Sequence, residues 1–436
     1  MLDIKYIREN SEKIKEAIKN KNIDLDLDAL LELDKKRVLS LQYIEELQAE
    51  KNKLNELMKK VADNDERKEL IEQGKAVKEK LAKVEPEYEI IRKEFDELML
   101  SVPNIPSEDT PIGKDDKDNV EVVKWGEIPK FDFEIKSHIE LGKDLDIIDT
   151  ERGVKVSGFR GYFLKNEAML LQMAVIMHAI SKMMEKGFSP MITPTIIKEF
   201  NLIGSGHFPF GKDEVYQISN PGKSEDGKDL KEKFYLSGTS EPALLGYFSN
   251  QILKEEELPK KVCGFSTCYR SEVGSYGKDT KGIYRMHEFM KVEQVVICKA
   301  DKKEADEWLE TMRKIAEEIL QDLKLPYRVL QICTGDMGAG KYKMYDIETW
   351  MPSRKDYGET HSDSNLTDWQ ARRLGIKYKD KEGNIKYAYT LNNTVIASPR
   401  ILVAILENYQ QADGSVKIPE VLRKYMPVPV DVISKK

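Results

Sequence analysis

Two stretches in which apolar residues recur at alternating steps of three and four constrain the fold of this chain most. They cover residues 30–61 and 70–98, and the short polar segment 62–67 joins them. This spacing is typical of helices that bury one stripe against each other. We therefore expect an antiparallel helical hairpin with helices of about thirty residues, or roughly 45–50 Å, each. Gly74 and Pro86 interrupt the second stretch, and Pro86 is expected to bend or break that helix locally.

The outer half of this helical arm is basic, in a chain whose net charge is -7. Residues 51–83 contain ten Lys and Arg against seven Asp and Glu. Taken alone, this balance favours a solvated coiled coil with interspersed charges. The alternative is an arm that lies along a phosphate backbone and recognises its shape.

A segment with linker composition follows the arm. Residues 101–118 contain Pro103, Pro106, Pro111 and Gly113 among acidic residues. We place the domain boundary there, so that residues 1–105 form the helical arm and residues 106–436 the second domain. Residues 106–165 of that domain are expected to be a linker and bridging segment.

The second domain shows strand-like stretches with hairpin-like spacing and helices collected between them. Strands are expected at residues 187–197 (broken by Pro194), 233–236, 262–270, 291–298, 327–333, 343–351 and 385–391. Helices are expected at residues 167–186, 241–254, 302–324, 366–374 and 400–409. This arrangement predicts an α+β domain on an antiparallel sheet rather than alternating βαβ units.

The cysteines and the apolar runs exclude several classes of protein. Cys263, Cys268, Cys298 and Cys333 show no paired short spacing, and the five histidines stand apart. We therefore expect neither a zinc site nor a disulfide framework, and a reducing cytoplasm as the location. The N-terminus lacks the layout of a secretory signal, and no apolar run is long enough to span a bilayer, so no membrane association is expected.

A hairpin over residues 266–298 places charges inside strand-like sequence. The first strand ends near Arg270, a polar loop passes Tyr276, Lys278 and Arg285, and a β-branched strand returns from about Glu288. Arg270 and Glu293 each need a partner there, because an unpaired charge in a strand is costly. That partner is either another protein group, in a structural ion pair, or a ligand.

Residues 335–341 imitate a phosphate-binding loop, with Gly335, Gly340 and Lys341 at the expected spacing. Tyr342 stands where the hydroxyl ligand of magnesium belongs, and the residues that follow are strand-like rather than helical. A phosphate loop must open a helix, so the sequence argues against this function.

Polar clusters interrupt the regular segments at residues 239–241, 270–272, 289–293, 359–362 and 400. Each has a structural interpretation, for example as helix caps at residues 237–240 or as an ordinary helix start at Arg400. Together they supply two arginines for a polyphosphate, two glutamates for an amine or a hydroxyl, and a glutamate with a nearby serine for a metal ion.

These clusters and the sequences around them closely resemble those of the seryl-tRNA synthetases of bacterial type, a class II aminoacyl-tRNA synthetase family. The resemblance covers nearly the whole chain. Its most specific parts are Tyr-Arg-Ser-Glu-Val-Gly-Ser at 269–275, Lys-Val-Glu at 291–293, Thr-Gly-Asp-Met-Gly at 334–338, and Pro-Arg-Ile-Leu-Val-Ala-Ile-Leu-Glu-Asn at 399–408. It implies a coiled-coil arm followed by a class II catalytic domain on a mixed, mainly antiparallel sheet.

The resemblance also implies a reaction. Family members activate L-serine with ATP to seryl-adenylate, release pyrophosphate, and pass the seryl group to the terminal ribose of tRNA(Ser), with tRNA(Sec) as a further acceptor. The residues that match the catalytic positions are Arg270, Arg400 and Glu293. The residues that match the ATP site are Arg270, Ser271, Glu272, Phe289, Glu359, Thr360, His361, Ser362 and Arg400.

Within that site the resemblance assigns individual tasks. Arg270 would meet the α-phosphate and the serine carboxylate, Arg400 the γ-phosphate, Glu272 the adenine amino group, and Phe289 the face of the base. Glu359 and Ser362 match the residues that hold the essential Mg²⁺, a hard cation suited to oxygen ligands. The residues that match the serine pocket are Thr239, Ser240, Glu241, Arg270, Glu293 and Thr394.

The resemblance changes how the arm is interpreted. In the family the arm contacts tRNA(Ser), commonly on the other subunit of a homodimer. The apolar helix at 167–186 and the strand through Pro194, which matches the first class II motif, would support such a dimer. Three features of the chain depart from the family pattern: His361 and Asp363, Asn393-Thr394-Val395, and Pro399 before Arg400. His361 is interpreted as an inert loop residue rather than a supporting hydrogen-bond partner. The alternatives are a paralogue that charges a carrier protein and an inactive coiled-coil scaffold.

Overall fold

The computed structural model describes residues 1–273 and 281–435 of the 436-residue chain. The expected loop residues Tyr276 and Lys278 lie outside the described residues. The chain divides into two compact units. One comprises Leu2–Lys19 and Ile23–Pro103, and the other comprises Met1, Asn20–Asn22 and Asn104–Lys436. No helix among the described residues has both the length and the apolar character that crossing a membrane requires.

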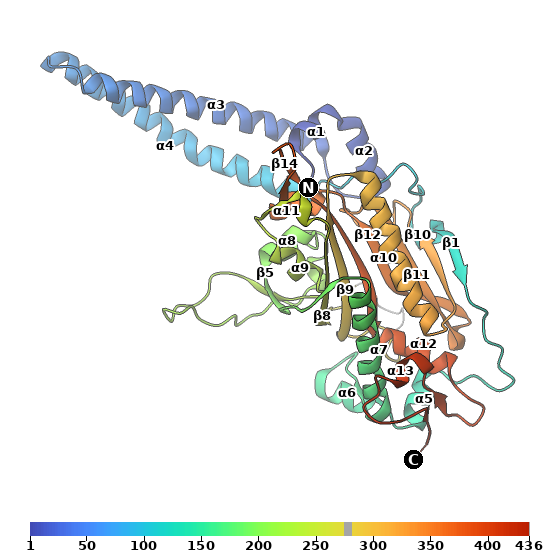
Figure 1. Ribbon diagram of the computed structural model, residues 1–436. Coiled ribbons are helices and arrows are strands. Elements are labelled where there is room, and N and C mark those ends of the chain that lie inside the picture. The colour runs from blue at the N-terminus through green and yellow to red at the C-terminus, as the bar shows by residue number, and fades with distance from the viewer. Residues whose placement is uncertain (274–280, 436) are drawn as a thin grey trace. The chain divides into compact units, whose positions relative to one another are not determined.

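The first unit is dominated by two long antiparallel helices (Figure 1). Its helices are α1 (Ile4–Glu9), α2 (Ser11–Asn20), α3 (Leu27–Met58) and α4 (Asn64–Ser101). Asp26 and Asp63 cap α3 and α4, because their side chains accept hydrogen bonds from the first free backbone amides of each helix. The predicted helical hairpin is therefore confirmed, with helices of 32 and 38 residues.

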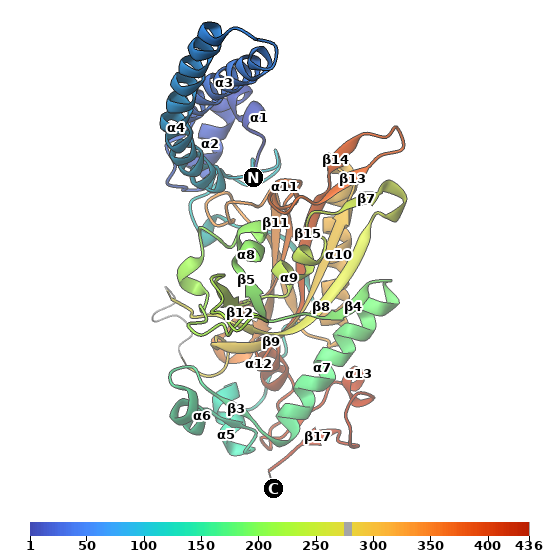
Figure 2. The ribbon, with the colours of Figure 1, turned by 90° about the vertical axis from the view of Figure 1, so that its left-hand side faces the viewer.

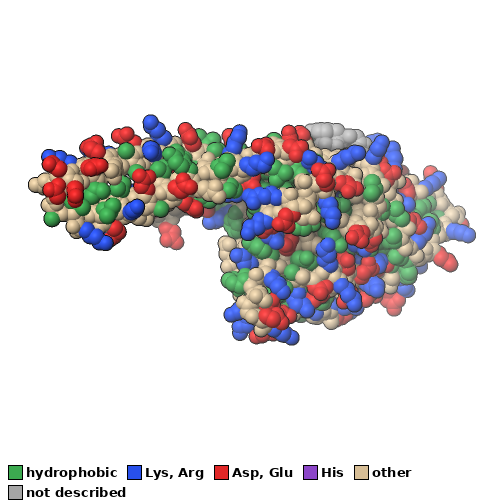
Figure 3. Space-filling model, turned by 90° about the horizontal axis from the view of Figure 1, so that it is seen from above, with side chains coloured by type: hydrophobic (Ala, Val, Ile, Leu, Met, Phe, Trp, Pro, Cys, Tyr) green, Lys and Arg blue, Asp and Glu red, His purple; other side chains and the backbone are tan. Residues whose placement is uncertain are grey.

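The apolar seam between α3 and α4 is the one that the spacing predicts. Its buried side chains are Ile44, Leu47, Leu54, Val77 and Leu81. Nearer the base of the arm, Arg37 occupies a seam position, pairs with Asp34 at 2.8 Å and lies 4.6 Å from the centre of the Phe95 ring. Its charge is thus balanced and its flat face is used for packing. On the face seen in Figure 3, basic and acidic side chains are interspersed along the helices.

Pro86 was expected to bend or break the helix, and the break is wrong, because α4 continues without interruption past both Gly74 and Pro86. A proline inside a helix leaves the carbonyl four residues earlier without its donor. Here that carbonyl belongs to Ala82, and both Ala82 and Pro86 are exposed. Water can therefore satisfy the carbonyl, and the flanking apolar stripe keeps the helix in place.

The second unit is built on an eight-stranded sheet (Figures 1 and 2). In spatial order its strands are β1 (Val120–Trp125), β10 (Tyr327–Gln331), β11 (Lys343–Met351), β12 (Asp356–Asn365), β15 (Tyr389–Ser398), β9 (Glu288–Cys298), β8 (Lys260–Tyr269) and β4 (Ser189–Ile192). Neighbouring strands are antiparallel except β4 and β8, which are parallel. The fold is therefore α+β on a mixed, mainly antiparallel sheet, as expected.

Smaller elements surround this sheet. The remaining strands are β2 (Ile148–Asp149), β3 (Phe163–Leu164), β5 (Ile196–Lys198), β6 (Phe234–Leu236), β7 (Ile252–Lys254), β13 (Lys377–Lys379), β14 (Ile385–Tyr387), β16 (Val416–Lys417) and β17 (Val432–Ile433). The α-helices are α5 (His138–Asp144), α6 (Thr150–Ser157), α7 (Asn166–Glu185), α8 (Glu199–Ser205), α9 (Glu241–Tyr247), α10 (Lys302–Asp322), α11 (Trp369–Leu374), α12 (Arg400–Asn408) and α13 (Glu420–Arg423). Short 3₁₀ turns occupy Asp116–Asp118, Lys212–Glu214, Glu255–Glu257 and Pro352–Arg354.

One face of the large sheet is sealed by helices, which leaves the other for a site. Helix α10 packs across β9, β12 and β15, and the side-chain amides of Gln294 and Asn393 both donate to the Met312 carbonyl of α10, at 3.0 and 3.1 Å. Because side chains alternate along a strand, Phe289, Lys291 and Glu293 of β9 point to the opposite face from Gln294.

Several expected elements differ from the structure. The helix expected at 241–254 ends at Tyr247, because Asn250 takes a left-handed conformation (φ 57°) and the chain continues as β7. The strand expected at 385–391 is two strands, of which β15 extends to Ser398. Strand β12 was not predicted, since its sequence Asp-Tyr-Gly-Glu-Thr-His-Ser-Asp-Ser-Asn carries almost no apolar signal.

Candidate functional site

The hairpin of β8 and β9 brings Arg270 onto the open face of the sheet. Cys268 pairs with Phe289, and the Arg270 amide donates to the His287 carbonyl at 3.0 Å. The Arg270 guanidinium lies 5.5 Å from the centre of the Phe289 ring, and its Nε donates to the Gly238 carbonyl at 3.3 Å. Within residues 1–273 and 281–435, no carboxylate lies within 4 Å of this guanidinium. The structural ion pair that the sequence left open is therefore not what holds Arg270.

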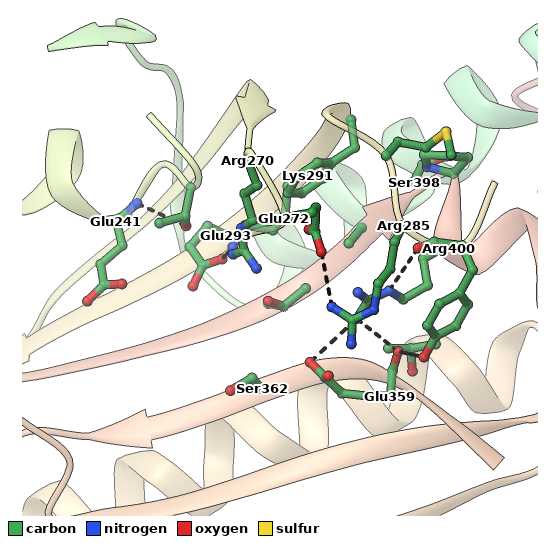
Figure 4. A pocket seen from close by; sticks show the side chains of 18 of the residues that line it. Glu241, Arg270, Glu272, Arg285, Lys291, Glu293, Glu359, Ser362, Ser398 and Arg400 are labelled. Carbon is green, nitrogen blue, oxygen red and sulfur yellow. Dashed lines mark hydrogen bonds and ion pairs between the residues drawn. The ribbon is translucent and has the colours of Figure 1, made fainter. Parts of the chain in front are cut away.

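A cavity of about 230 Å³ opens on this face, and most of the predicted site residues line it (Figure 4). They come from β9, β12, β15, the segment that follows β8, the residues at and just before the start of α9, and the start of α12. The predicted residues that line the cavity are Thr239, Glu241, Arg270, Glu272, Phe289, Glu293, Glu359, Thr360, Ser362, Thr394 and Arg400. Segments as far apart in sequence as residues 239 and 400 thus supply one site.

Three predicted residues lie outside the lining. Ser240 is buried beneath it, where its hydroxyl bonds that of Ser266 at 2.8 Å. The Ser271 hydroxyl donates to the Asp213 carbonyl at 2.7 Å. His361 is buried on β12 behind the cavity wall. These side chains are placed to support the cavity rather than to face it.

One end of the cavity is rich in carboxylates. The Glu241 Oε1 accepts from the amides of Gln370 and Asn392 at 2.6 and 2.9 Å, which fixes the orientation of this carboxylate. Glu293 is buried and lies 2.5 Å from the Lys291 ammonium. Burial raises the pKa of Glu293, and the Lys291 charge opposes that rise. Thr394 pairs with Glu293 across β15 and β9.

The other end gathers cations and an exposed carboxylate. The Arg400 Nη1 donates to the Glu359 carbonyl at 3.1 Å and lies 3.4 Å from the Glu359 carboxylate. The Arg400 guanidinium also stacks 4.6 Å from the centre of the Tyr284 ring. Nearby, Glu272 bridges two cations, Arg285 at 3.2 Å and Arg160 at 3.3 Å. Arg285 and Arg400 line the cavity here, and two guanidinium groups that face a cavity are suited to bind anionic oxygens.

Glu359 and Ser362 present oxygen atoms to the same part of the cavity. Behind them, Asp346 pairs with Ser362 across β11 and β12, and its Oδ1 is shut off from solvent with no hydrogen-bond partner among the described residues. Burial, followed by the Glu359 charge, raises the pKa of Asp346 well above its usual value. This all-oxygen set matches Mg²⁺, which is commonly held by one or two protein oxygens together with phosphates and waters.

The sequence suggested that His361 is an inert loop residue, and this interpretation is wrong. It lies where the pairing of β12 and β15 stops, and its Nε2 donates to the Val395 carbonyl at 3.1 Å. Its Nδ1 then accepts from the Thr360 hydroxyl at 2.8 Å. Burial lowers the pKa of His361 to about 4, so the ring is neutral at neutral pH and bridges the two strands.

Sequence reasoning missed several lining residues, notably His207, Lys341 and Asn392. His207 follows α8, and its Nδ1 bonds the Ser205 hydroxyl at 2.9 Å. Burial, with the charges of Arg270, Lys341 and Lys291, lowers the pKa of His207 to about 3. A lone histidine in a loop carries no sequence signal, whereas Lys341 was visible within the imitation phosphate loop.

Comparison with known proteins identifies the family. The sequence pattern of the "Seryl-tRNA synthetase N-terminal domain" matches residues 1–106. That of the "tRNA synthetase class II core domain (G, H, P, S and T)" matches residues 216–409. The two patterns thus cover the helical arm and most of the sheet that carries the cavity.

Relatives match over nearly the whole chain. The serine–tRNA ligase of Deinococcus radiodurans is 47% identical over 98% of this chain and 97% of its own. That of Treponema denticola is 46% identical over 98% of both chains. The crystal structure of seryl-tRNA synthetase from Pyrococcus horikoshii complexed with ATP superposes with a TM-score of 0.87 at 38% identity and covers 100% of both chains. The chain therefore belongs to the seryl-tRNA synthetase family of class II aminoacyl-tRNA synthetases.

Proposed function

We propose that the chain is a serine–tRNA ligase. It activates L-serine with ATP to seryl-adenylate and pyrophosphate, and then transfers the seryl group to the 3'-terminal ribose of tRNA(Ser), with tRNA(Sec) as a second acceptor. The observation that carries this proposal is the order of groups in one cavity. Arg270 has no carboxylate within 4 Å among the described residues, with Glu241 and Glu293 at one end of the cavity and Arg400 and Glu359 at the other. An amino acid with an ammonium and a hydroxyl suits the first end, and a triphosphate suits the second.

In the first step an oxygen of the serine carboxylate attacks the α-phosphorus of ATP, and pyrophosphate leaves. Two anions must approach each other, so positive charge between them lowers the barrier. Two observations support Arg270 in this role: it lies between the two ends of the cavity (Figure 4), and within residues 1–273 and 281–435 its guanidinium is not paired with a carboxylate. Arg400 then holds the γ-phosphate, from the start of α12, where the helix dipole favours an anion.

The nucleoside is held by the hairpin. Phe289 offers a ring face on which adenine stacks, with the Arg270 guanidinium 5.5 Å from that ring. Glu272 accepts from the adenine amino group, and its pairing with Arg160 and Arg285 holds the carboxylate in place for this contact. The Ser271 hydroxyl anchors the end of this hairpin to the Asp213 carbonyl, and Thr360 lines the cavity from β12.

Serine is held at the carboxylate end. Thr239, Glu241 and Glu293 receive its ammonium and hydroxyl, and Thr394 adds a hydroxyl beside Glu293. Ser240 supports this wall from behind through Ser266. Alanine is rejected because it leaves a buried acceptor unpaired, which costs far more than a lost methylene contact.

Glu359 and Ser362 would hold Mg²⁺ through their oxygen atoms, and the ion would supply positive charge beside the phosphates. The Arg400 contact with the Glu359 backbone fixes the position of this carboxylate next to the γ-phosphate site.

The arm is proposed to bind tRNA(Ser). Of the ten Lys and Arg at residues 51–83, seven have no acidic group within 4 Å in the described part of the arm. Those seven are Lys51, Lys53, Lys60, Arg67, Lys78, Lys80 and Lys83. All are exposed and available to phosphates. We also propose a homodimer, on the exposed apolar face of α7, and the cytoplasmic location stays a prediction from the cysteines.

The decisive experiment is amino-acid-dependent exchange of labelled pyrophosphate into ATP, followed by charging of tRNA(Ser) transcripts. Serine should support exchange, and serine should then appear on the tRNA. No exchange with any amino acid would favour the inactive scaffold. Exchange that is faster with another amino acid, without tRNA charging, would favour a carrier-protein ligase, although the arm of 32- and 38-residue helices argues against it.

A further inference from the structure

Lys341, from the segment that imitates a phosphate loop, lines the serine end of the cavity. The segment 335–341 opens no helix, and β11 follows it directly. Its lysine is nevertheless one of the cavity-lining residues. The motif therefore places a cation in the site without being a phosphate loop, and the reaction described above leaves this cation without a task.

The backbone fixes the end of the cavity at which Lys341 lies. The amide of the next residue, Tyr342, donates to the Asn365 carbonyl at 2.8 Å, at the last residue of β12. Asn365 pairs with Leu391, the neighbour of Asn392, whose amide holds Glu241. Glu359 lies six residues back along β12, roughly 20 Å away at 3.3 Å per residue. Lys341 is therefore on the Glu241 side, away from the triphosphate end.

Electrostatics agree with this placement. Burial is the main cause of the raised pKa of Glu293, and the Lys341 charge is among those that oppose it. The Lys341 charge also contributes to the lowered pKa of His207, after burial and Arg270. Glu293 belongs to the carboxylate end, so the Lys341 ammonium lies near a group expected to contact the amino acid.

Lys341 has no partner for its charge in the part of the chain that the structure describes. In the two described ranges, no carboxylate lies within 4 Å of its Nζ, whereas Lys291 is already paired with Glu293 at 2.5 Å. The side chain is only partly exposed. A partly buried cation without a partner is costly, and a ligand atom that accepts a hydrogen bond would remove that cost.

The backbone that carries Lys341 is held rigidly. The buried Lys21 ammonium donates to the carbonyls of Ala339 and Lys341 at 3.1 and 2.5 Å. The Asn104 amide groups donate to the carbonyls of Ala339 and Gly340 at 2.8 and 3.2 Å. A Cβ at Gly340 would lie 2.6 Å from the Trp369 ring, so this position has room only for glycine. The direction of the Lys341 side chain is thus fixed in advance of substrate binding.

We propose that Lys341 donates a hydrogen bond to the side-chain oxygen of the amino acid substrate, while Glu293 accepts the proton of the same hydroxyl. A hydroxyl is both donor and acceptor, so a cation and a carboxylate together satisfy it completely. Alanine offers neither Lys341 nor Glu293 this hydroxyl partner. Lys341 is therefore a specificity-determining residue, and this inference rests on the proposed function as a serine–tRNA ligase.

The test compares Lys341→Met with Lys343→Met. Lys343 is two residues further along, and its ammonium pairs with Asp109 at 2.5 Å outside the cavity. Exchange kinetics are measured with serine and with alanine, together with the Kd of the non-hydrolysable seryl- and alanyl-sulfamoyl adenosines. Lys341→Met should lower kcat/KM for serine, and weaken the seryl analogue, by about 10- to 100-fold, the size of one charge-assisted hydrogen bond. Alanine values and the KM for ATP should change little, and Lys343→Met should change neither.

A fall that is equal for the serine and alanine compounds, or no fall, would overturn the inference. Lys341→Gln keeps a neutral donor and should recover part of the serine preference, which a purely structural role would not require. The circular dichroism spectrum and the ATP affinity of each variant show that it is folded. If the unaltered protein itself shows no serine-dependent exchange, the proposed function fails; if it does and the serine-to-alanine ratio of Lys341→Met is unchanged, only the inference fails.

Discussion

At the scale of single residues, Arg270 is the group on which the first reaction step depends most. Arg270→Ala removes the positive charge between the α-phosphate and the serine carboxylate. Serine-dependent exchange should fall by about 10³-fold or more, since losing even one neutral donor at a developing charge costs 10²- to 10³-fold. The fold and tRNA binding should be nearly unchanged, as judged by circular dichroism and filter binding. Exchange that persists in this variant would contradict the role given to Arg270.

His361 leads to a prediction about pH. Its pKa is about 4 in the folded chain and about 6.5 when unfolded. Between these values the unfolded state binds more protons, so the free energy of unfolding falls as pH falls below 6.5, by about 1.4 kcal/mol per unit. From pH 7.5 to pH 5 the loss due to His361 is about 2 kcal/mol. His361→Gln has no such titration, and urea unfolding at the two pH values should show a loss smaller by about that amount. An identical loss in both proteins would contradict the neutral, buried ring.

The residues that sequence alone revealed are those whose charge conflicts with their local structure. Arg270 and Glu293 were visible because strand-like sequence surrounds them. His207 and Asn392 were not, because a loop histidine and a strand asparagine are ordinary until the fold brings them to one wall. His361 was misjudged because the strand that buries it was not recognised.

At the scale of elements, periodic apolar residues decided what was predictable. The arm followed from its seam, whose spacing leaves one arrangement for residues such as Ile44 and Val77. Strand β12 was missed because it is a central strand whose side chains are polar on both faces. Ser362 faces the cavity, and Asp363 lies buried on the other face, paired with Asn393. No periodicity in hydrophobicity marks such a strand.

The arm itself can be tested by two matched sets of substitutions. Changing the unpaired Lys53, Lys78 and Lys80 to Gln should weaken tRNA(Ser) binding about tenfold or more. It should also make the salt dependence of log K less steep, by up to about 0.7 for each phosphate that is no longer neutralised. The control set changes Lys59, Lys68 and Lys75, each of which is ion-paired with the acidic residue three positions earlier. It has the same net charge but should bind more tightly than the first set. Filter binding at several salt concentrations measures both.

Pyrophosphate exchange should be unchanged in both sets, because the cavity lies in the other unit. Deletion of residues 39–90 should likewise spare exchange while abolishing tRNA charging. Charging at the normal rate after this deletion would show that the arm is only structural.

At the scale of the whole molecule, the site is assembled by topology rather than by sequence order. The cavity takes Arg270 and Glu293 from one hairpin, Glu359 from a strand that follows α10, and Arg400 from the helix after β15. Antiparallel neighbours in the order β12, β15, β9 and β8 place these residues side by side. The spacing of residues along the chain does not reveal the spatial order of the strands. The types of the site residues were therefore predictable, but their arrangement in space was not.

A second property of the whole molecule is its expected assembly as a homodimer. Helix α7 and the edge strand β4 contact each other (Figure 2). They expose Met177, Met184 and Ile192, with 44%, 57% and 86% of their surface in solvent. Three large apolar side chains on adjoining elements, one of them an unpaired sheet edge, are characteristic of a protein–protein interface.

Met177→Glu combined with Met184→Glu should therefore disrupt the dimer, because burying two carboxylates in an apolar interface is unfavourable. Light scattering after size exclusion should give twice the chain mass of 50.2 kDa for the unaltered protein and the single mass for the variant. The control is Ile385→Glu on β14, which is also 57% exposed but lies on a different small sheet. It should remain dimeric. A variant of α7 that keeps the double mass would place the interface on another surface, and an unaltered protein of single mass would contradict the homodimer itself.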